Sequence, residues 1–303
     1  MKIMEKQREL FSNNEINVIR KKQTTKKRIL SASSINTYLQ CPRKFFYQYI
    51  KKLPTKDSIY LLRGSIVHEV LEDFYDLDDK LEKTNFDEIK DWFLTKIKET
   101  FSIKWKQNEE KLMNLGLDNQ TLMFFFNESI LMLENWTKII FNKIQKVMNE
   151  KKINFNQAFL LLKPIRESYY KSDKMKIHGY IDAIHEFDNK IIIIDYKTSK
   201  SSELKDTYKL QLGLYALLYQ EKHNKFPDEV GLFFLKDKEL LIKPNENLII
   251  KTLEKLNYVK NNTETEDISN YPMNPTKLCK WKNAKGSGQC DFYEYCFENK
   301  ETK

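Results

Sequence analysis

Residues 176–197, KIHGYIDAIHEFDNKIIIIDYK, decide the fold. Apolar residues alternate with polar ones in the first half of this segment, which predicts one strand. The β-branched run at 191–194 predicts a second, buried strand. Asp188 and Asn189 lie between the two, and both residue types tolerate positive φ. A two-residue hairpin loop is therefore expected.

This loop fixes a register in which Asp182 lies directly opposite Asp195. Directly opposed residues have Cβ atoms about 4.5–5.5 Å apart, and like charges at that separation are destabilising. Lys197 follows Asp195 by two residues, so the strand period returns it to the same face. Two carboxylates and one ammonium should therefore converge, and a divalent cation is expected to offset the paired negative charges.

The sequences GYID at 179–182 and DYKT at 195–198 resemble the G-x-x-D and D-x-K elements of the PD-(D/E)XK nuclease superfamily, in its RecB-like branch. An Asp-x-Lys pair alone is more often a solvated strand end than a metal site. The resemblance therefore depends on further segments that follow in the order typical of the family.

A helix is expected at residues 61–75, and it carries Gly64, His68, Leu71 and Glu72 in the spacing of the family's G-x-x-x-H-x-x-L-E motif. A lone helical histidine is usually structural or solvent-facing. The resemblance implies instead that His68 supplies a metal ligand. Glu72 lies one turn further on, where it could orient the imidazole ring.

A second helix is expected to follow a polar linker at 198–202 and to run through Gln220. Gln211 and Tyr215 are four residues apart and so share one helical face. An ordinary amphipathic helix packed on the sheet would explain the leucines around them. The pair resembles the family's Q-x-x-x-Y motif, which implies that both side chains contact the DNA backbone near the metal.

The chain has 303 residues, a formal net charge of +9 and a pI near 9.0. A basic chain of this kind favours a polyanionic partner, although a biased genome also produces lysine-rich usage. No apolar stretch is long enough to span a bilayer and no signal segment is evident. We therefore expect an intracellular, cytoplasmic protein that is not bound to a membrane.

The expected fold class is α/β, with a restriction-endonuclease-like mixed central sheet flanked by helices. Residues 1–30 are expected to form a basic, flexible arm, and residues 31–303 are expected to form one nuclease domain. A helical insertion covers about 76–159, a strand is expected at 160–170, and two further strands and a helix follow at 230–235, 239–242 and 248–259. Phe124, Phe125, Phe126, Leu131, Leu133 and Trp136 are predicted core residues of the insertion.

Four cysteines are too few for a disulfide scaffold in a chain of this length. The segments around residue 41 and residues 279–296 resemble the cysteine segments of Fe–S-containing RecB-like nucleases, which implies a 4Fe–4S cluster on Cys41, Cys279, Cys290 and Cys296. The sequence departs from the family pattern because ten residues, not two, separate Cys279 from Cys290. A flexible surface loop is expected there. Zinc is the chemical alternative, since four thiolates also make a closed tetrahedral site.

The resemblance implies a DNA nuclease, an exonuclease more than an endonuclease, that processes DNA ends in recombination, repair or replication. Mg²⁺ or Mn²⁺ would be held by His68, Asp182, Asp195 and the carbonyl of Tyr196, with Lys197 at the reacting phosphate. The expected partners are single-stranded DNA or duplex ends and a helicase or integrase. The alternatives are a non-catalytic Fe–S or zinc-stapled nucleic-acid-binding module, or a nuclease subunit of a helicase or CRISPR-adaptation complex.

Overall fold

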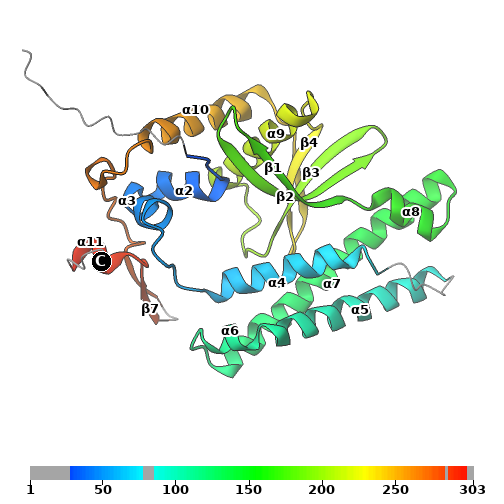
Figure 1. Ribbon diagram of the computed structural model, residues 1–303. Helices are drawn as coiled ribbons and strands as arrows, with labels where there is room; N and C mark the ends of the chain where they lie inside the picture. The colour runs from blue at the N-terminus through cyan, green and yellow to red at the C-terminus, as the bar shows by residue number, and fades with distance from the viewer. Residues whose placement is uncertain (1–27, 78–84, 284–285, 299–303) are drawn as a thin grey trace, which may run out of the picture.

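The computed structural model of the protein describes residues 28–77, 85–283 and 286–298 (Figure 1). The expected basic arm at 1–30 lies outside these ranges, apart from residues 28–30. A central sheet is covered by helices on both faces, which confirms the expected mixed α/β architecture. Among the described residues, no helix combines the length and the apolar character that crossing a membrane requires.

The central sheet has five strands in the order β1-β2-β3-β4-β5. Their bounds are Ile165–Ser172, Ile177–Phe187, Lys190–Lys197, Glu229–Phe234 and Glu239–Ile242. Neighbouring strands are antiparallel except for β3 and β4, which are parallel. A parallel pair needs a crossover connection. Helix α9 (Asp206–His223) provides it by carrying the chain back across one face of the sheet.

The β2–β3 turn has the expected two-residue loop. Asp188 and Asn189 adopt φ values of 50° and 61°, and Phe187 pairs with Lys190. Two successive residues with positive φ match the right-handed twist of the flanking strands. The register continues unbroken to Ala183 paired with Ile194, so the predicted hairpin is confirmed up to the residues beside the carboxylates.

One face of the sheet packs against α9, α2 (Ala32–Gln40) and α10 (Glu246–Asn262). Helix α2 begins with a capping box formed by Ser31 and Ser34. Pro42 is the first residue of α3 (Pro42–Phe45), as expected from its fixed φ, and the π-helix η1 (Phe46–Ile50) follows directly.

The helices on the opposite side have the bounds Ile59–Phe74 (α4), Phe86–Gln107 (α5), Asn119–Lys151 (α7) and Phe155–Leu162 (α8). The short helix α6 (Glu109–Met113) packs its buried Leu112 against Ile59 and Phe125 in a separate small cluster. The largest buried side chains on this side of the sheet include Phe74, Phe93 and Trp136. Two residues expected in this core are instead on the surface, because Phe124 is 48% exposed and Leu131 is 63% exposed.

The strand expected at 160–170 is only half correct. Helix α8 continues to Leu162, and β1 begins at Ile165, after Pro164. A capping box formed by Asn154 and Gln157 starts this helix. The buried face of this helix consists of Phe155, Ala158 and Phe159, whereas Leu160 and Leu161 in its last turn are exposed.

The two ends of the described chain pack against each other. Arg43 of α3 donates its Nε–H to the carbonyl oxygen of Tyr271 at 2.7 Å, and the Tyr47 hydroxyl donates to the carbonyl of Tyr295 at 3.3 Å. The C-terminal segment contains η3 (Ile268–Asn270), β6 (Lys280–Asn283), β7 (Gly286–Gln289) and α11 (Tyr293–Phe297).

The segment between Cys279 and Cys290 forms a two-stranded antiparallel hairpin, β6–β7. The loop expected between these cysteines therefore includes two short paired strands among its described residues. Trp281 pairs with Gly288, and a Cβ on Gly288 would overlap the indole ring, so glycine is what allows the ring to lie across the partner strand. The amide of Cys290 donates to the carbonyl of Cys279 at 2.9 Å, which brings the two ends of the hairpin together.

Gly213 allows α9, the helix that carries Gln211 and Tyr215, to approach α10 closely. A Cβ added at Gly213 would overlap Thr252 Oγ1 and lie 3.0 Å from Thr252 Cβ, and Thr252 is buried. We expect Gly213→Ala to lower the free energy of unfolding by about 1–3 kcal/mol through overpacking, as measured by denaturant titration.

Gly64→Ala in α4 is the matched control, because its new Cβ would only contact Thr198 Oγ1 at 3.7 Å. Helix propensity alone should make that variant neutral or more stable. Adding Thr252→Ala to Gly213→Ala should recover part of the loss. Strictly additive effects, or a Gly213→Ala variant as stable as the control, would contradict this account of the α9–α10 contact.

Candidate nuclease site

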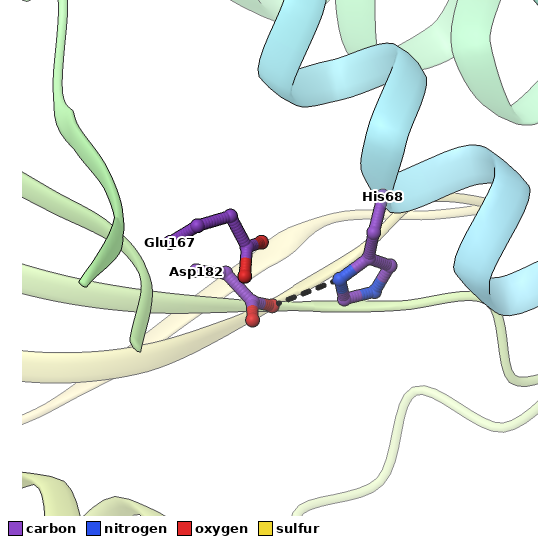
Figure 2. A group of neighbouring side chains, drawn as sticks. All are labelled: His68, Glu167 and Asp182. Carbon is purple, nitrogen blue, oxygen red and sulfur yellow. Dashed lines mark ion pairs between the residues drawn. The ribbon is translucent and has the colours of Figure 1, made fainter. Parts of the chain in front are cut away.

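The first half of the site joins β2, β3 and α4. Asp182 Oδ2 accepts a hydrogen bond from the amide of Tyr196 at 2.8 Å and lies 3.4 Å from His68 Nδ1 (Figure 2). His68 Nε2 lies 3.1 Å from the carbonyl oxygen of Tyr196. Beyond the Ala183–Ile194 pair, the Tyr196 amide thus donates to the Asp182 side chain and not to the backbone of β2.

The second half of the site joins β3 to α9. Lys197 Nζ forms an ion pair with Asp195 Oδ2 and donates to Gln211 Oε1 at 3.0 Å. Gln211 Nε2 in turn donates to Asp195 Oδ1 at 2.7 Å and to the Tyr215 hydroxyl at 2.8 Å. Tyr215 donates its own hydroxyl proton to Asp195 Oδ1 at 3.3 Å. The Q-x-x-x-Y pair thus holds Asp195 and Lys197 in place within the protein.

The two aspartates are both buried, and their carboxylates turn toward different donors. Burial, followed by the negative charge of Asp195, holds the pKa of Asp182 well above its usual range. Burial alone would lower the pKa of Lys197, but the Asp195 carboxylate outweighs it and raises that pKa. Burial lowers the pKa of His68, which keeps the imidazole neutral near pH 7 and able to donate a lone pair to a metal.

Glu167 is a site residue that the sequence analysis missed. It lies on β1 between Arg166 and Ser168, which pair with Ala183 and Ile181, so it faces Asp182 across the strands. Figure 2 shows its carboxylate beside the Asp182 carboxylate and the His68 ring. Its φ of 43° is unusual for a residue with a side chain, and such strained backbone is concentrated at functional sites. Burial raises the pKa of its carboxyl group.

A buried ion network fixes the chain just after Lys197. Arg63, on the buried stripe of α4, forms an ion pair with Glu128 of α7 and donates to the carbonyl of Thr198 at 3.0 Å. Glu128 also pairs with Lys236. An arginine on an otherwise apolar stripe is a sequence signal that could have revealed this network.

The expected role of Glu72 in orienting His68 is not found. Both ring nitrogens of His68 face other groups, the Tyr196 carbonyl and Asp182. Glu72 instead lines the surrounding cleft. The other residues lining this cleft are Tyr60, Leu61, Arg63, Gly64, Ser65, His68, Glu69, Glu167, Tyr196, Lys197, Thr198, Ser199 and Tyr208.

The donor set suits a hard divalent cation. One ligand atom from each of His68, Glu167 and Asp182 lies within 4.8 Å of the others, and the Tyr196 carbonyl lies beside His68. Oxygen ligands with a single imidazole match the preferences of Mg²⁺ and Mn²⁺. Asp195, expected in this set, is turned toward Lys197 and Gln211. Apart from its ion pair with Lys197, its buried Oδ2 accepts no hydrogen bond from any described residue.

The four cysteines come together from the two ends of the chain. Cys41, Cys279, Cys290 and Cys296 all line one small cavity, together with Lys44, Met273, Asn274, Pro275, Phe292, Tyr293 and Phe297. Burial, and then the neighbouring Cys41, raises the pKa of Cys296 to about 11, and burial also raises the pKa of Cys290. The sequence prediction that these thiols share one place in the fold agrees with this arrangement.

Two curated proteins resemble parts of the chain. The CRISPR-associated exonuclease Cas4 of Francisella tularensis subsp. novicida is 29% identical over 126 residues, which cover 42% of this chain and 59% of that protein. One subunit of the ATP-dependent helicase/nuclease of Clostridium botulinum is 30% identical over 107 residues, which cover 34% of this chain and 9% of that protein. The chain thus matches less than two thirds of the length of either relative.

A solved structure and a family model extend over most of the chain. The crystal structure is that of a protein from Eubacterium rectale assigned as an exonuclease, with 13% identity, a TM-score of 0.45 and coverage of 93% of this chain and 92% of that one. The family model, described as the PD-(D/E)XK nuclease superfamily, matches residues 29–297. The chain therefore belongs to the PD-(D/E)XK nuclease superfamily.

Proposed function

We propose that this protein is a divalent-metal-dependent nuclease that hydrolyses phosphodiester bonds at DNA ends. The observation that carries this proposal is the meeting of His68, Glu167 and Asp182 within 4.8 Å, next to the buried Asp195–Lys197 pair. The Francisella relative is named an exonuclease. That name supports action at ends over internal cleavage.

The chemistry can be divided among the residues. A divalent cation on His68, Glu167, Asp182 and the Tyr196 carbonyl would activate water and offset negative charge on the phosphate. Lys197 brings the one ammonium of this network to the edge of the cleft, where it would stabilise charge developing on the phosphate oxygens. Gln211 and Tyr215 hold Asp195 and Lys197 in position, and direct contact of this pair with the DNA backbone stays a prediction.

The cysteine cavity supports a structural metal group that ties the two ends of the domain together. Four thiolates suit either a 4Fe–4S cluster, which the family resemblance implies, or a zinc ion in a closed tetrahedral site.

The relatives also suggest a working context. One is named as CRISPR-associated and the other as part of a helicase/nuclease. A helicase or integrase that presents DNA ends to this protein is the corresponding partner.

The catalytic assignment predicts that Asp195→Asn abolishes cleavage. The variant keeps the shape of the side chain but loses the charge that holds Lys197. An end-labelled single-stranded and a duplex DNA substrate should show at least a hundredfold slower release of nucleotides in Mg²⁺ or Mn²⁺. DNA affinity should stay near wild type, because phosphate contacts dominate it. Asp237→Asn, on the β4–β5 turn, is the control, and undiminished cleavage by Asp195→Asn would contradict the assignment.

The metal assignment predicts that Glu167→Gln weakens Mn²⁺ binding by at least about tenfold, the scale of losing a well-placed ligand or its support. Calorimetric titration of the DNA-free protein measures this directly. Glu72→Gln is the matched control, because that carboxylate lines the same cleft without joining the three-residue group. Equal affinities for the two variants would remove Glu167 from the metal site.

The cysteine assignment predicts that Cys41→Ser and Cys296→Ser both lose bound iron and sulfide and melt at lower temperature, because metal binding is coupled to folding. Elemental analysis and visible absorption of anaerobically purified protein measure the first effect, and calorimetry the second.

Replacing residues 282–287 with Asn-Gly is the control, because a two-residue turn can close β6 on β7 at the Trp281–Gly288 pair. That variant should retain the metal. Full metal content and an unchanged melting temperature in Cys41→Ser would contradict the assignment, and zinc without iron would identify the other occupant.

A further inference from the structure

Two tyrosines form an exposed pair close to the acidic residues of the site. Tyr169 on β1 is the direct cross-strand partner of Tyr180 on β2. Their ring centroids are 5.0 Å apart at an interplanar angle of 48°, and their exposed fractions are 48% and 57%. We call Tyr169 and Tyr180 the tyrosine pair. Large aromatic side chains usually bury their rings, so two neighbouring exposed rings mark a surface that can bind a flat partner.

The tyrosine pair lies on the face of the sheet that carries the metal-site candidates. A Cβ on Gly179 would lie 3.2 Å from the Tyr215 ring of α9, so the next residue, Tyr180, points to the opposite face. Likewise Tyr170 is buried and contacts Tyr219 of α9, which directs Tyr169 away from that helix. The opposite face is the one on which α4 brings His68 to the sheet.

The tyrosine pair is also next to the acidic residues along both strands. Tyr169 follows Glu167 by two residues, and Tyr180 precedes Asp182 by two. At about 3.3 Å per residue, the pair lies roughly 7 Å along the hairpin from the two carboxylates. Figure 1 shows the β1–β2 hairpin leading away from α4. The exposure of both rings shows that the tyrosine pair is open to solvent.

The far end of the same hairpin is basic. Lys171, Lys174 and Lys176 lie there with one acidic residue, Asp173, which contacts Lys171 at 3.0 Å and Lys176 at 3.7 Å. Exposed ion pairs of this kind are weak and exchange readily for a phosphate. From the acidic group outward, the hairpin therefore offers metal ligands, two aromatic rings and then a surplus of ammonium groups.

This order matches the chemistry of a polynucleotide strand. Phosphates would meet the metal at one end and lysines at the other, with a base over the rings between them. An aromatic ring can stack on a base only when that base is not already stacked on both sides within a duplex. A cross-strand aromatic pair stabilises a hairpin in any case, but that role does not require the ring faces to be exposed.

We propose that the tyrosine pair is a stacking platform for a nucleobase of a single-stranded polynucleotide, next to the phosphate held at the acidic group. This inference rests on the proposed nuclease function and specifies its substrate as a single strand or a frayed end. The β1–β2 hairpin is then the track along which that strand lies.

The test measures binding of a fluorescent single-stranded oligonucleotide, and of a blunt duplex of the same sequence, by anisotropy. It uses the Asp195→Asn protein without added metal. Replacing both tyrosines with leucine should weaken single-strand binding about 5- to 150-fold, the loss expected for one stacked base. Replacing both with phenylalanine should leave it within about twofold. Duplex binding should change little in either variant.

Tyr258→Leu is the matched control, because Tyr258 on α10 is 56% exposed and also lies beside a second tyrosine. Its ring centroid is 6.1 Å from that of Tyr38. This variant should bind both DNAs as the parent does. Any of three results would overturn the platform. They are normal single-strand binding by the leucine variant, single-strand affinity of the phenylalanine variant as low as that of the leucine variant, and equal losses of affinity for single strands and duplex.

A second measurement does not depend on the folding of any variant. Oligonucleotides with a single 2-aminopurine near one end should lose fluorescence on binding the parent protein when the analogue occupies the platform. Unquenched fluorescence at every position tested would overturn the inference. If binding depends on the tyrosines but the native protein does not cleave DNA, only the nuclease proposal is contradicted. If the native protein cleaves DNA but binding does not depend on the tyrosines, only the stacking platform is contradicted.

Discussion

The register of the β2–β3 hairpin is the constraint on which the rest of the site depends. A slip of one residue would move every side chain of β3 to the other face of the sheet. Asp195 would then lose Gln211 and Tyr215 of α9, and Asp182 would lose the Tyr196 amide. The two-residue turn of Asp188 and Asn189 prevents this slip, because both residues adopt the left-handed conformation that such a turn requires.

Each of the two central carboxylates has its own set of partners, which offsets the repulsion between them. Asp182 turns toward α4 and the metal-site candidates, whereas Asp195 turns toward α9 and Lys197. The two halves of the site thus lie between helices from opposite faces of the sheet, and the sheet itself carries the acids. A helix that moved relative to the sheet would disturb only its own half of the network.

Local signals in the sequence predicted this hairpin and the helices around it, because turn chemistry and capping act over a few residues. Glu167 was missed for a physical reason. Its position depends on the β1–β2 register, and the connection at 173–176 lacks the Asn-Gly or Asp-Gly signal of a short turn, even though Lys176 adopts a φ of 56°. Arg63 was missed because its partner Glu128 is 65 residues away on another helix. The helical pattern places Arg63 on the buried stripe of α4, but it does not identify a partner that lies so far away in the sequence.

The hairpin between Cys279 and Cys290 has a consequence for reading cysteine spacing. Residues added to a chain as two antiparallel strands return to their starting point, so the distance between their ends is set by one strand separation and not by their number. Ten intervening residues here leave the flanking backbone groups in direct hydrogen-bond contact at 2.9 Å. A motif defined by a fixed gap would discard such a chain. A pattern that allowed either two residues or an even-length hairpin at that gap would retain this chain. Relatives could then be grouped by the side chains that their inserted strands present to solvent.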